Sequence, residues 1–309
     1  MSRKTQLYTG LLTGLLGCLG LPGRAWCEGQ PLGSPPEVTK QAEESTRPFG
    51  VAGGLQWRQL AVADQDPANN QYLLFFLAGS YRLPWNLSAV AQLGATQKFV
   101  AEEGETGFFF QDMALGLGYK HTLPLPRLGQ LDKVSLGHQL LFYLPTSRAS
   151  WNQDLILAPQ WKTVASVSAL SILSLDLEGF FQYRFHRYAD RVGPGGGLNT
   201  RLVLGGALRG NVDIWEWKSW GKLRGGVEGS CSWVLKYPSR DSYEASVSDQ
   251  APWFQGYGWA TYLDYAPRSY VSFRLALEQG GNVLREGIVN TFLFHRDETE
   301  LSFGATFTY

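Results

Sequence analysis

The sequence predicts an all-β fold: a transmembrane, antiparallel, up-and-down β-barrel of about 12 strands in a single domain. Two patterns predict it. Apolar and polar residues alternate from about residue 50 to the end of the chain, which is the period of a strand with two different faces. The alternating segments are about ten to fourteen residues long, which exceeds the usual strand length and suits a tilted membrane crossing.

The segment 173–186 shows the two faces clearly, because Leu175 and Leu177 alternate there with Asp176 and Glu178. Segments 109–120, 201–214, 222–236 and 270–278 repeat this scheme. The predicted strands are 50–62, 71–83, 87–100, 108–121, 134–144, 155–166, 172–188, 199–215, 222–237, 254–265, 269–280 and 299–309.

Alternation alone does not separate a soluble β-sandwich, whose apolar faces meet, from a membrane barrel, whose apolar faces contact lipid. Aromatic residues near the ends of the apolar faces favour the membrane, since such girdles sit at the two headgroup layers. The candidate girdle residues are Trp57, Tyr81, Tyr119, Trp161, Trp215, Trp233, Tyr257, Trp259 and Tyr265.

The predicted connections also alternate in length, as in barrels with short periplasmic turns and longer outer loops. Short turns are expected at 83–86, 168–171, 216–222 and 266–269, and longer polar loops at 63–70, 101–107, 145–154, 189–197 and 239–252. This order indicates that both termini are periplasmic. The Pro-rich segment 123–133 is a long exception on the short side, and 281–298 is compatible with a loop or a hairpin.

The N-terminal residues predict a secretory signal peptide over 1–27. Arg3 and Lys4 precede an apolar run over 7–21, and the small residues of Ala25-Trp26-Cys27 suit cleavage before residue 28. No uninterrupted apolar run of about 20 residues, the length of a transmembrane helix, follows in the sequence.

A second processing route is open, because Leu15-Leu16-Gly17-Cys18 resembles the box that precedes a lipid-modified cysteine in bacterial lipoproteins. Cleavage after Cys27 instead leaves Cys231 as the only cysteine, and a lone thiol forms no internal disulfide.

Residues 28–48 are rich in Pro, Glu, Ser and Gln and poor in apolar side chains. Such a segment buries too little surface to offset its ordering entropy. We therefore expect a disordered periplasmic linker or a plug in the barrel mouth, followed by the barrel over 49–309.

The chain ends in an alternating strand whose apolar positions include Phe303 and Phe307 and whose final residue is Tyr309. This ending resembles the C-terminal signal by which bacterial outer-membrane β-barrels are recognised for insertion; no specific family is identified. The resemblance covers the last strand in detail and the rest in pattern. It implies the bacterial outer membrane as location, outer-membrane lipid and the barrel-insertion machinery as partners, and Phe303, Phe307 and Tyr309 as the insertion signal.

The charge balance argues against a nucleic-acid partner, because the 27 basic residues are equal in number to the 27 acidic residues and leave no basic excess. Aromatic residues and glycine are abundant, with 11 Trp, 14 Tyr, 17 Phe and 36 Gly, yet the mean hydropathy is −0.17. This combination is typical of a wall with one apolar and one polar face.

The polar face carries both signs of charge, and charges in a narrow lumen must be paired or hydrated. In one interpretation, each charged residue belongs to a salt-bridged filling of the lumen. In the other, Arg184, Arg201, Arg209 and Arg224 form a basic ladder that orients small polar or anionic solutes. The predicted lumen-lining residues are Asp112, Lys120, Asp176, Glu178, Arg184, Arg201, Arg209, Asp213, Arg224, Glu228, Arg274 and Glu278, with Lys222 beside them.

The sequence offers little catalytic chemistry, since no spacing of its four histidines resembles a metal site or a serine-hydrolase triad. Ser135 and His138 face opposite sides of one predicted strand, and His186 is expected to be a polar wall residue at the outer rim. The glycine-rich segment 193–197 lacks the residues of a phosphate-binding loop. We expect no catalytic residue, metal or cofactor.

Three functions remain open. The leading hypothesis is a channel or passive transporter for small polar solutes. The second is a structural or adhesive barrel with a filled lumen, which acts through loops 145–154 and 239–252 with Trp151, Tyr243 and Trp253. The third is a lipid-modifying outer-membrane enzyme.

Overall fold

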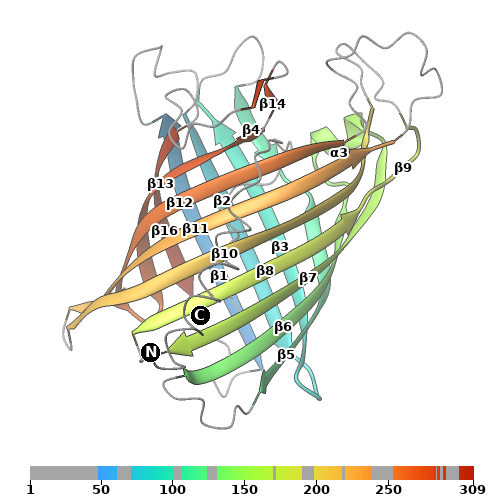
Figure 1. Ribbon diagram of the computed structural model, residues 1–309. Coiled ribbons are helices and arrows are strands. Elements are labelled where there is room, and N and C mark those ends of the chain that lie inside the picture. Colours follow the sequence, from blue (N-terminus) through green and yellow to red (C-terminus); the bar gives the residue numbers. More distant parts are fainter. Residues whose placement is uncertain are drawn as a thin grey trace, which may run out of the picture.

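The computed structural model describes residues 48–60, 71–99, 106–123, 131–169, 172–189, 198–217, 220–237, 253–282, 284–285, 288–289 and 299–309. The predicted signal peptide, Cys18 and the predicted linker up to residue 47 lie outside the described residues. The described strands form a closed antiparallel barrel (Figure 1), which confirms the predicted fold class.

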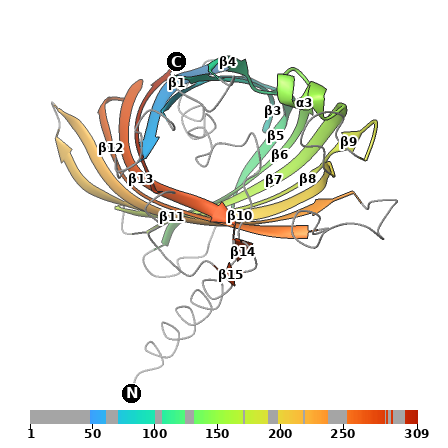
Figure 2. The same cartoon turned by 90° about the horizontal axis from the view of Figure 1, so that it is seen from above.

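Twelve long strands make up the wall, each antiparallel to its neighbours and joined in chain order. They are β1 (Phe49–Leu60), β2 (Tyr72–Arg82), β3 (Leu87–Lys98), β5 (Met113–Leu123), β6 (Leu131–Leu144), β7 (Leu155–Ala169), β8 (Leu173–Tyr183), β10 (Thr200–Trp217), β11 (Gly221–Lys236), β12 (Trp253–Arg268), β13 (Val271–Asn282) and β16 (Thr299–Thr308). The barrel closes because β1 pairs with both β2 and β16, so that the ring of strands seen from above is complete (Figure 2).

The structure refines three of the predicted segments. The strand predicted over 108–121 is divided into β4 (Gly107–Phe110) and β5, because Gln111 and Asp112 leave the strand and bind neighbouring segments. The strand predicted over 172–188 ends at Tyr183, and a short β9 (Phe185–His186) pairs with β7. A small hairpin of β14 (Leu284–Arg285) and β15 (Ile288–Val289) lies within 281–298.

The predicted loop 145–154 contains one turn of helix, α3 (Arg148–Asn152). Ser147 caps it, since the Ser147 hydroxyl accepts a hydrogen bond of 3.1 Å from the backbone N–H of Ser150. Among the described residues, no helix is long and apolar enough to cross a membrane.

The two ends of the barrel differ. At one end, the turn end, short turns join β2 to β3, β7 to β8, β10 to β11 and β12 to β13; the opposite loop end carries β4 and α3 (Figure 1). Trp85 and Asn86 in the first of these turns have φ values of 61° and 59°, the left-handed pair typical of tight hairpins.

The outer and inner faces of the wall follow the sequence alternation. In β8, Leu177 is 58% exposed on the outside, whereas the neighbouring Asp176 is 4% exposed. Of the predicted girdle residues, Tyr81, Tyr119, Trp161, Trp215 and Trp233 are exposed, while Trp57, Tyr257, Trp259 and Tyr265 are partly covered. An apolar outer face and a polar inner face are what a bilayer-spanning barrel requires.

Candidate functional site

Aromatic side chains on the inner face lie flat against the wall. Each covers a glycine directly opposite on the neighbouring strand, and a Cβ atom at that glycine would overlap the ring. The pairs are Phe76 over Gly54, Phe180 over Gly205 and Tyr262 over Gly226. The Tyr262 hydroxyl also donates a hydrogen bond of 2.6 Å to the Asn211 side chain. These three inner rings therefore extend along the wall.

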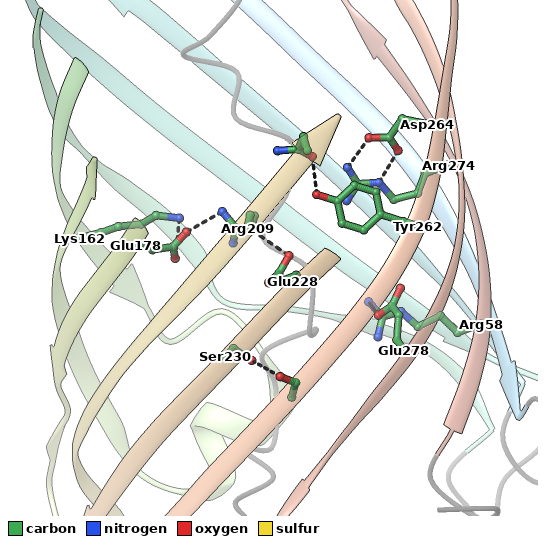
Figure 3. Close-up of polar contacts among 12 residues, drawn as sticks. Arg58, Lys162, Glu178, Arg209, Glu228, Ser230, Tyr262, Asp264, Arg274 and Glu278 are labelled. Carbon is green, nitrogen blue, oxygen red and sulfur yellow. Dashed lines mark hydrogen bonds and ion pairs between the residues drawn. The ribbon is translucent and has the colours of Figure 1, made fainter. Parts of the chain in front are cut away.

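A first chain of ion pairs, the lateral cluster, crosses four adjacent strands from β7 to β11 (Figure 3). Glu178 accepts from Lys162 at 2.9 Å and from Arg209 at 3.0 Å. Arg209 also binds Glu228 at 2.8 Å. Two cations and two carboxylates thus neutralise one another along the wall, and all four side chains are at most 14% exposed.

A second group, the closure cluster, lies where the two ends of the barrel sequence meet. Arg58 of β1 contacts Glu278 of β13 at 3.0 Å and Glu300 of β16 at 3.6 Å. Tyr72 donates a hydrogen bond of 2.9 Å to Glu300, and Ser302 donates one of 2.5 Å to Glu278. Arg58 is 2% exposed, and such a buried charge requires these carboxylates.

The third group, the turn-end row, alternates in sign across β10 to β13. Asp213, Arg224, Asp264 and Arg274 stand opposite one another in strand register. Asp213 accepts from Arg224 at 2.9 Å and from Lys222 at 2.6 Å, and Arg274 donates to both oxygens of Asp264 at 2.6 and 2.8 Å. The Arg274 guanidinium also lies 4.1 Å from the centre of the Tyr262 ring.

The ion pairs in these three clusters join strands that are adjacent or that have a single strand between them. They therefore follow the wall and do not cross the interior (Figure 3). Eight of the predicted lumen-lining residues take part or stand beside a member: Asp176 (opposite Arg209), Glu178, Arg209, Asp213, Arg224, Glu228, Arg274 and Glu278.

The structure does not bring the four arginines of the predicted ladder into one row. Arg209 and Arg224 belong to different clusters, and each binds a carboxylate. Arg184 donates a hydrogen bond of 3.0 Å to Gln182. Arg201 lies at an irregularity of the β10–β11 register and donates to the Tyr183 hydroxyl at 3.2 Å. The four guanidinium groups form local pairs instead of a ladder: Arg201, Arg209 and Arg224 find partners on a neighbouring strand, and Arg184 finds one two residues away in its own segment.

Two further predicted residues lie apart from the clusters. Asp112 is at the loop end, where it accepts hydrogen bonds from the backbone N–H of Ser147 and from the Ser150 hydroxyl and so anchors α3. Lys120 is near the turn end of β5, where its backbone N–H donates to the Asn86 carbonyl.

Sequence reasoning missed several members of the clusters, namely Arg58, Tyr72, Lys162, Asp264 and Glu300. The alternation of side chains along a strand would have identified these residues, because every second residue lies on the same face. Arg58 shares its face with buried Ala52, and Asp264 shares its face with buried Tyr262.

The described histidines make local contacts. His138 lies 3.0 Å through Nδ1 from the Thr163 hydroxyl and stacks on His121, and His186 donates from Nδ1 to the Gln153 carbonyl at 2.8 Å. Within the described residues, no group of three His, Cys, Asp or Glu side chains could hold a metal ion. Phe303, Phe307 and Tyr309 of the predicted insertion signal are exposed on the outer face.

Neither a protein-family description nor a curated protein matches the chain in sequence. Solved structures resemble it in fold. An outer-membrane channel from Pseudomonas putida F1 matches 90% of this chain and 100% of its own length, with a TM-score of 0.50 and 10% identity. The NanC porin matches over 84% and 98% (TM-score 0.45, 12% identity), and LpxR from Salmonella typhimurium over 84% and 99% (TM-score 0.36, 11% identity).

At such low identity the likeness shows the fold alone. The fold is that of bacterial outer-membrane β-barrels, which confirms the resemblance seen in the last strand and agrees with the expected location in the outer membrane.

Proposed function

We propose that this outer-membrane β-barrel is a passive channel for small polar solutes. One observation carries the proposal: the three inner rings and the ion-paired side chains of the three clusters lie along the wall, as Phe180 does over Gly205 and Arg209 does between Glu178 and Glu228. A filled lumen would instead need side chains that meet across the axis. A barrel of about eight strands has an interior that its side chains just fill, and this barrel has twelve strands.

The test is the single-channel conductance of protein purified from membranes and inserted into a planar bilayer. We expect discrete, reproducible current steps. Absence of steps from protein shown to be folded would overturn the channel proposal.

The lateral cluster allows a sharper form of this test. Its two cations balance its two carboxylates, so Arg209→Gln leaves an excess of negative charge on the wall. We expect the reversal potential in a salt gradient to shift towards cation preference. Arg209→Lys, which keeps the charge, is the matched control; equal shifts in both variants would contradict a lumenal role for this charge.

A second candidate function is contact with a partner at the loop end. It is favoured by Trp151, which is 71% exposed although its helix is held by Asp112 and Ser147. A fixed, exposed indole is a typical anchor of an interface. Trp151→Ala should abolish binding of such a partner to whole cells and leave conductance unchanged.

A further inference from the structure

The charged groups of the inner wall differ in how far they are covered. In the closure cluster, the side chains of Arg58 and Glu278 are 3% and 8% exposed. In the turn-end row, the cations are far more open: Lys222 is 35% exposed, and Arg224 and Arg274 are 40% exposed. Their carboxylate partners Asp213 and Asp264 are only 17% and 20% exposed. The surface offered by this row is therefore mainly cationic.

The hydrogen-bonding capacity of the row points the same way. Both oxygens of Asp213 are occupied, one by Lys222 and the other by Arg224. Both oxygens of Asp264 are occupied by Arg274. An ammonium carries three N–H donors and a guanidinium five, so Lys222 and Arg224 keep donors beyond those that bind Asp213. Spare donors remain on the cations after the acceptors are used.

Two of these three cations, Lys222 and Arg224, are also close to each other. The Lys222 ammonium and the Arg224 guanidinium each lie within 3 Å of the same carboxylate, so one negative charge is shared by two positive charges. Glu216 stands opposite Lys222 in register and is exposed near the end of β10. Arg274 is oriented by Asp264 and by the face of Tyr262.

From this arrangement we infer an anion-binding station at the turn end of the lumen, formed by Lys222, Arg224 and Arg274. Its ligand is an oxyanion carried by a small solute, a phosphate or a carboxylate, which Arg recognises through paired N–H donors and Lys as a point charge. The inference deepens the proposed channel function, because it names the class of solute that the lumen would retain.

Binding is measured independently of conduction, by phosphorus NMR of inorganic phosphate added to the purified protein in a detergent without phosphate groups. We expect line broadening that saturates with phosphate in the wild type. Lys222→Gln with Arg224→Gln should weaken phosphate binding about tenfold, the effect of losing one to two charge-assisted hydrogen bonds. Arg148→Gln, which removes an exposed cation on α3 at the loop end, should leave binding unchanged.

A substitution of opposite sign guards against loss of structure as the explanation. Asp213→Asn removes the negative charge shared by Lys222 and Arg224, so it should tighten phosphate binding severalfold. Weaker or unchanged binding in this variant would overturn the station, as would a wild type that does not broaden the phosphate line. Displacement of phosphate by succinate would identify a general oxyanion station, and failure to displace it would identify a phosphate-selective one.

The two proposals fail separately. Phosphate binding by a protein that passes no current would retain the station and reject the channel. Current without any phosphate binding would retain the channel and reject the station.

Discussion

Gly54, Gly205 and Gly226 show how single residues shape the inner wall. Each lies opposite an aromatic residue whose ring covers the place of the missing side chain. An aromatic ring that shields a glycine on the next strand keeps its apolar contact while extending along the wall. The space near the axis depends on these glycines as much as on the rings.

Gly205→Val should push the Phe180 ring away from the wall, because the new Cβ would overlap it and lie 3.1 Å from the Cys231 carbonyl oxygen. We expect a loss of about 1–3 kcal/mol in the free energy of unfolding, as for other overpacked sites, and a lower single-channel conductance. Urea unfolding and bilayer recordings measure the two effects. Gly229→Val is the matched control, since a Cβ there meets nothing within 4 Å; equal effects in both variants would contradict the packing role.

Arg58 and Arg224 form a second matched pair, one covered and one open. Arg58→Ala leaves the buried carboxylate of Glu278 without its cation, which we expect to cost about 3–5 kcal/mol. Arg224→Ala, at a site 40% exposed, should cost about 0–1 kcal/mol. Denaturant unfolding of the two variants in one detergent compares them, and similar losses would show that burial does not govern these pairs.

At the scale of elements, the loop end contains a rim built from short pieces. Gln153, which follows α3, accepts through its carbonyl from the His186 ring at 2.8 Å and from the Asn199 side-chain amide at 3.0 Å. Asn199 is fully buried, and its amide also reaches the Tyr188 carbonyl. Segments from three parts of the chain are thereby tied together at one rim, which a five-residue helix could not organise alone.

Asp112→Ala should release α3, because its carboxylate binds both the Ser147 backbone and the Ser150 hydroxyl. We expect faster hydrogen exchange of the α3 amides and no change in the exchange of the long strands. Mass spectrometry of exchanged peptides resolves the two regions. Arg148→Ala on the exposed side of the same helix should have little effect, and unchanged α3 protection in the Asp112 variant would refute the anchoring role.

At the scale of the whole molecule, closure depends on the last strand. β16 pairs with β1 on one side and β13 on the other, and its outward residues Leu301, Phe303 and Phe307 face the membrane together with Tyr309. A closed barrel has no free strand edge, so the backbone groups along the edges of β1 and β13 stay unpaired until β16 is in place. The role of its aromatic residues as an insertion signal remains a prediction.

Replacing Phe307 and Tyr309 together with Ala should reduce the amount of folded barrel recovered from the outer membrane, because each ring contributes about 1.5–3 kcal/mol when taken out of water and both are predicted to be recognised on insertion. The heat-dependent shift in gel mobility measures the folded fraction. Val51→Ala and Leu55→Ala, which change exposed apolar residues of the adjacent β1, form the control. An equal loss in the control would assign the effect to lipid contact in general.

The sequence by itself determined the faces of the wall. The period of two assigned Leu177 to the outside and Glu178 to the inside without any knowledge of neighbours, because successive side chains of a strand point to opposite faces. Strand length, turn positions and the aromatic ending followed from equally local patterns.

Only the tertiary structure decided which side chains bind one another. Arg58 meets Glu278 across more than two hundred residues of chain because closure brings β1, β16 and β13 together, and no local pattern encodes that distance. Asp112 binds Ser147 and Ser150 at the rim, and this contact depends on the neighbouring connection and not on the alternation of its own strand. The sequence of each strand determines which charges face inwards. Which of these charges neutralise one another depends on strand register and barrel closure, which are properties of the assembled barrel.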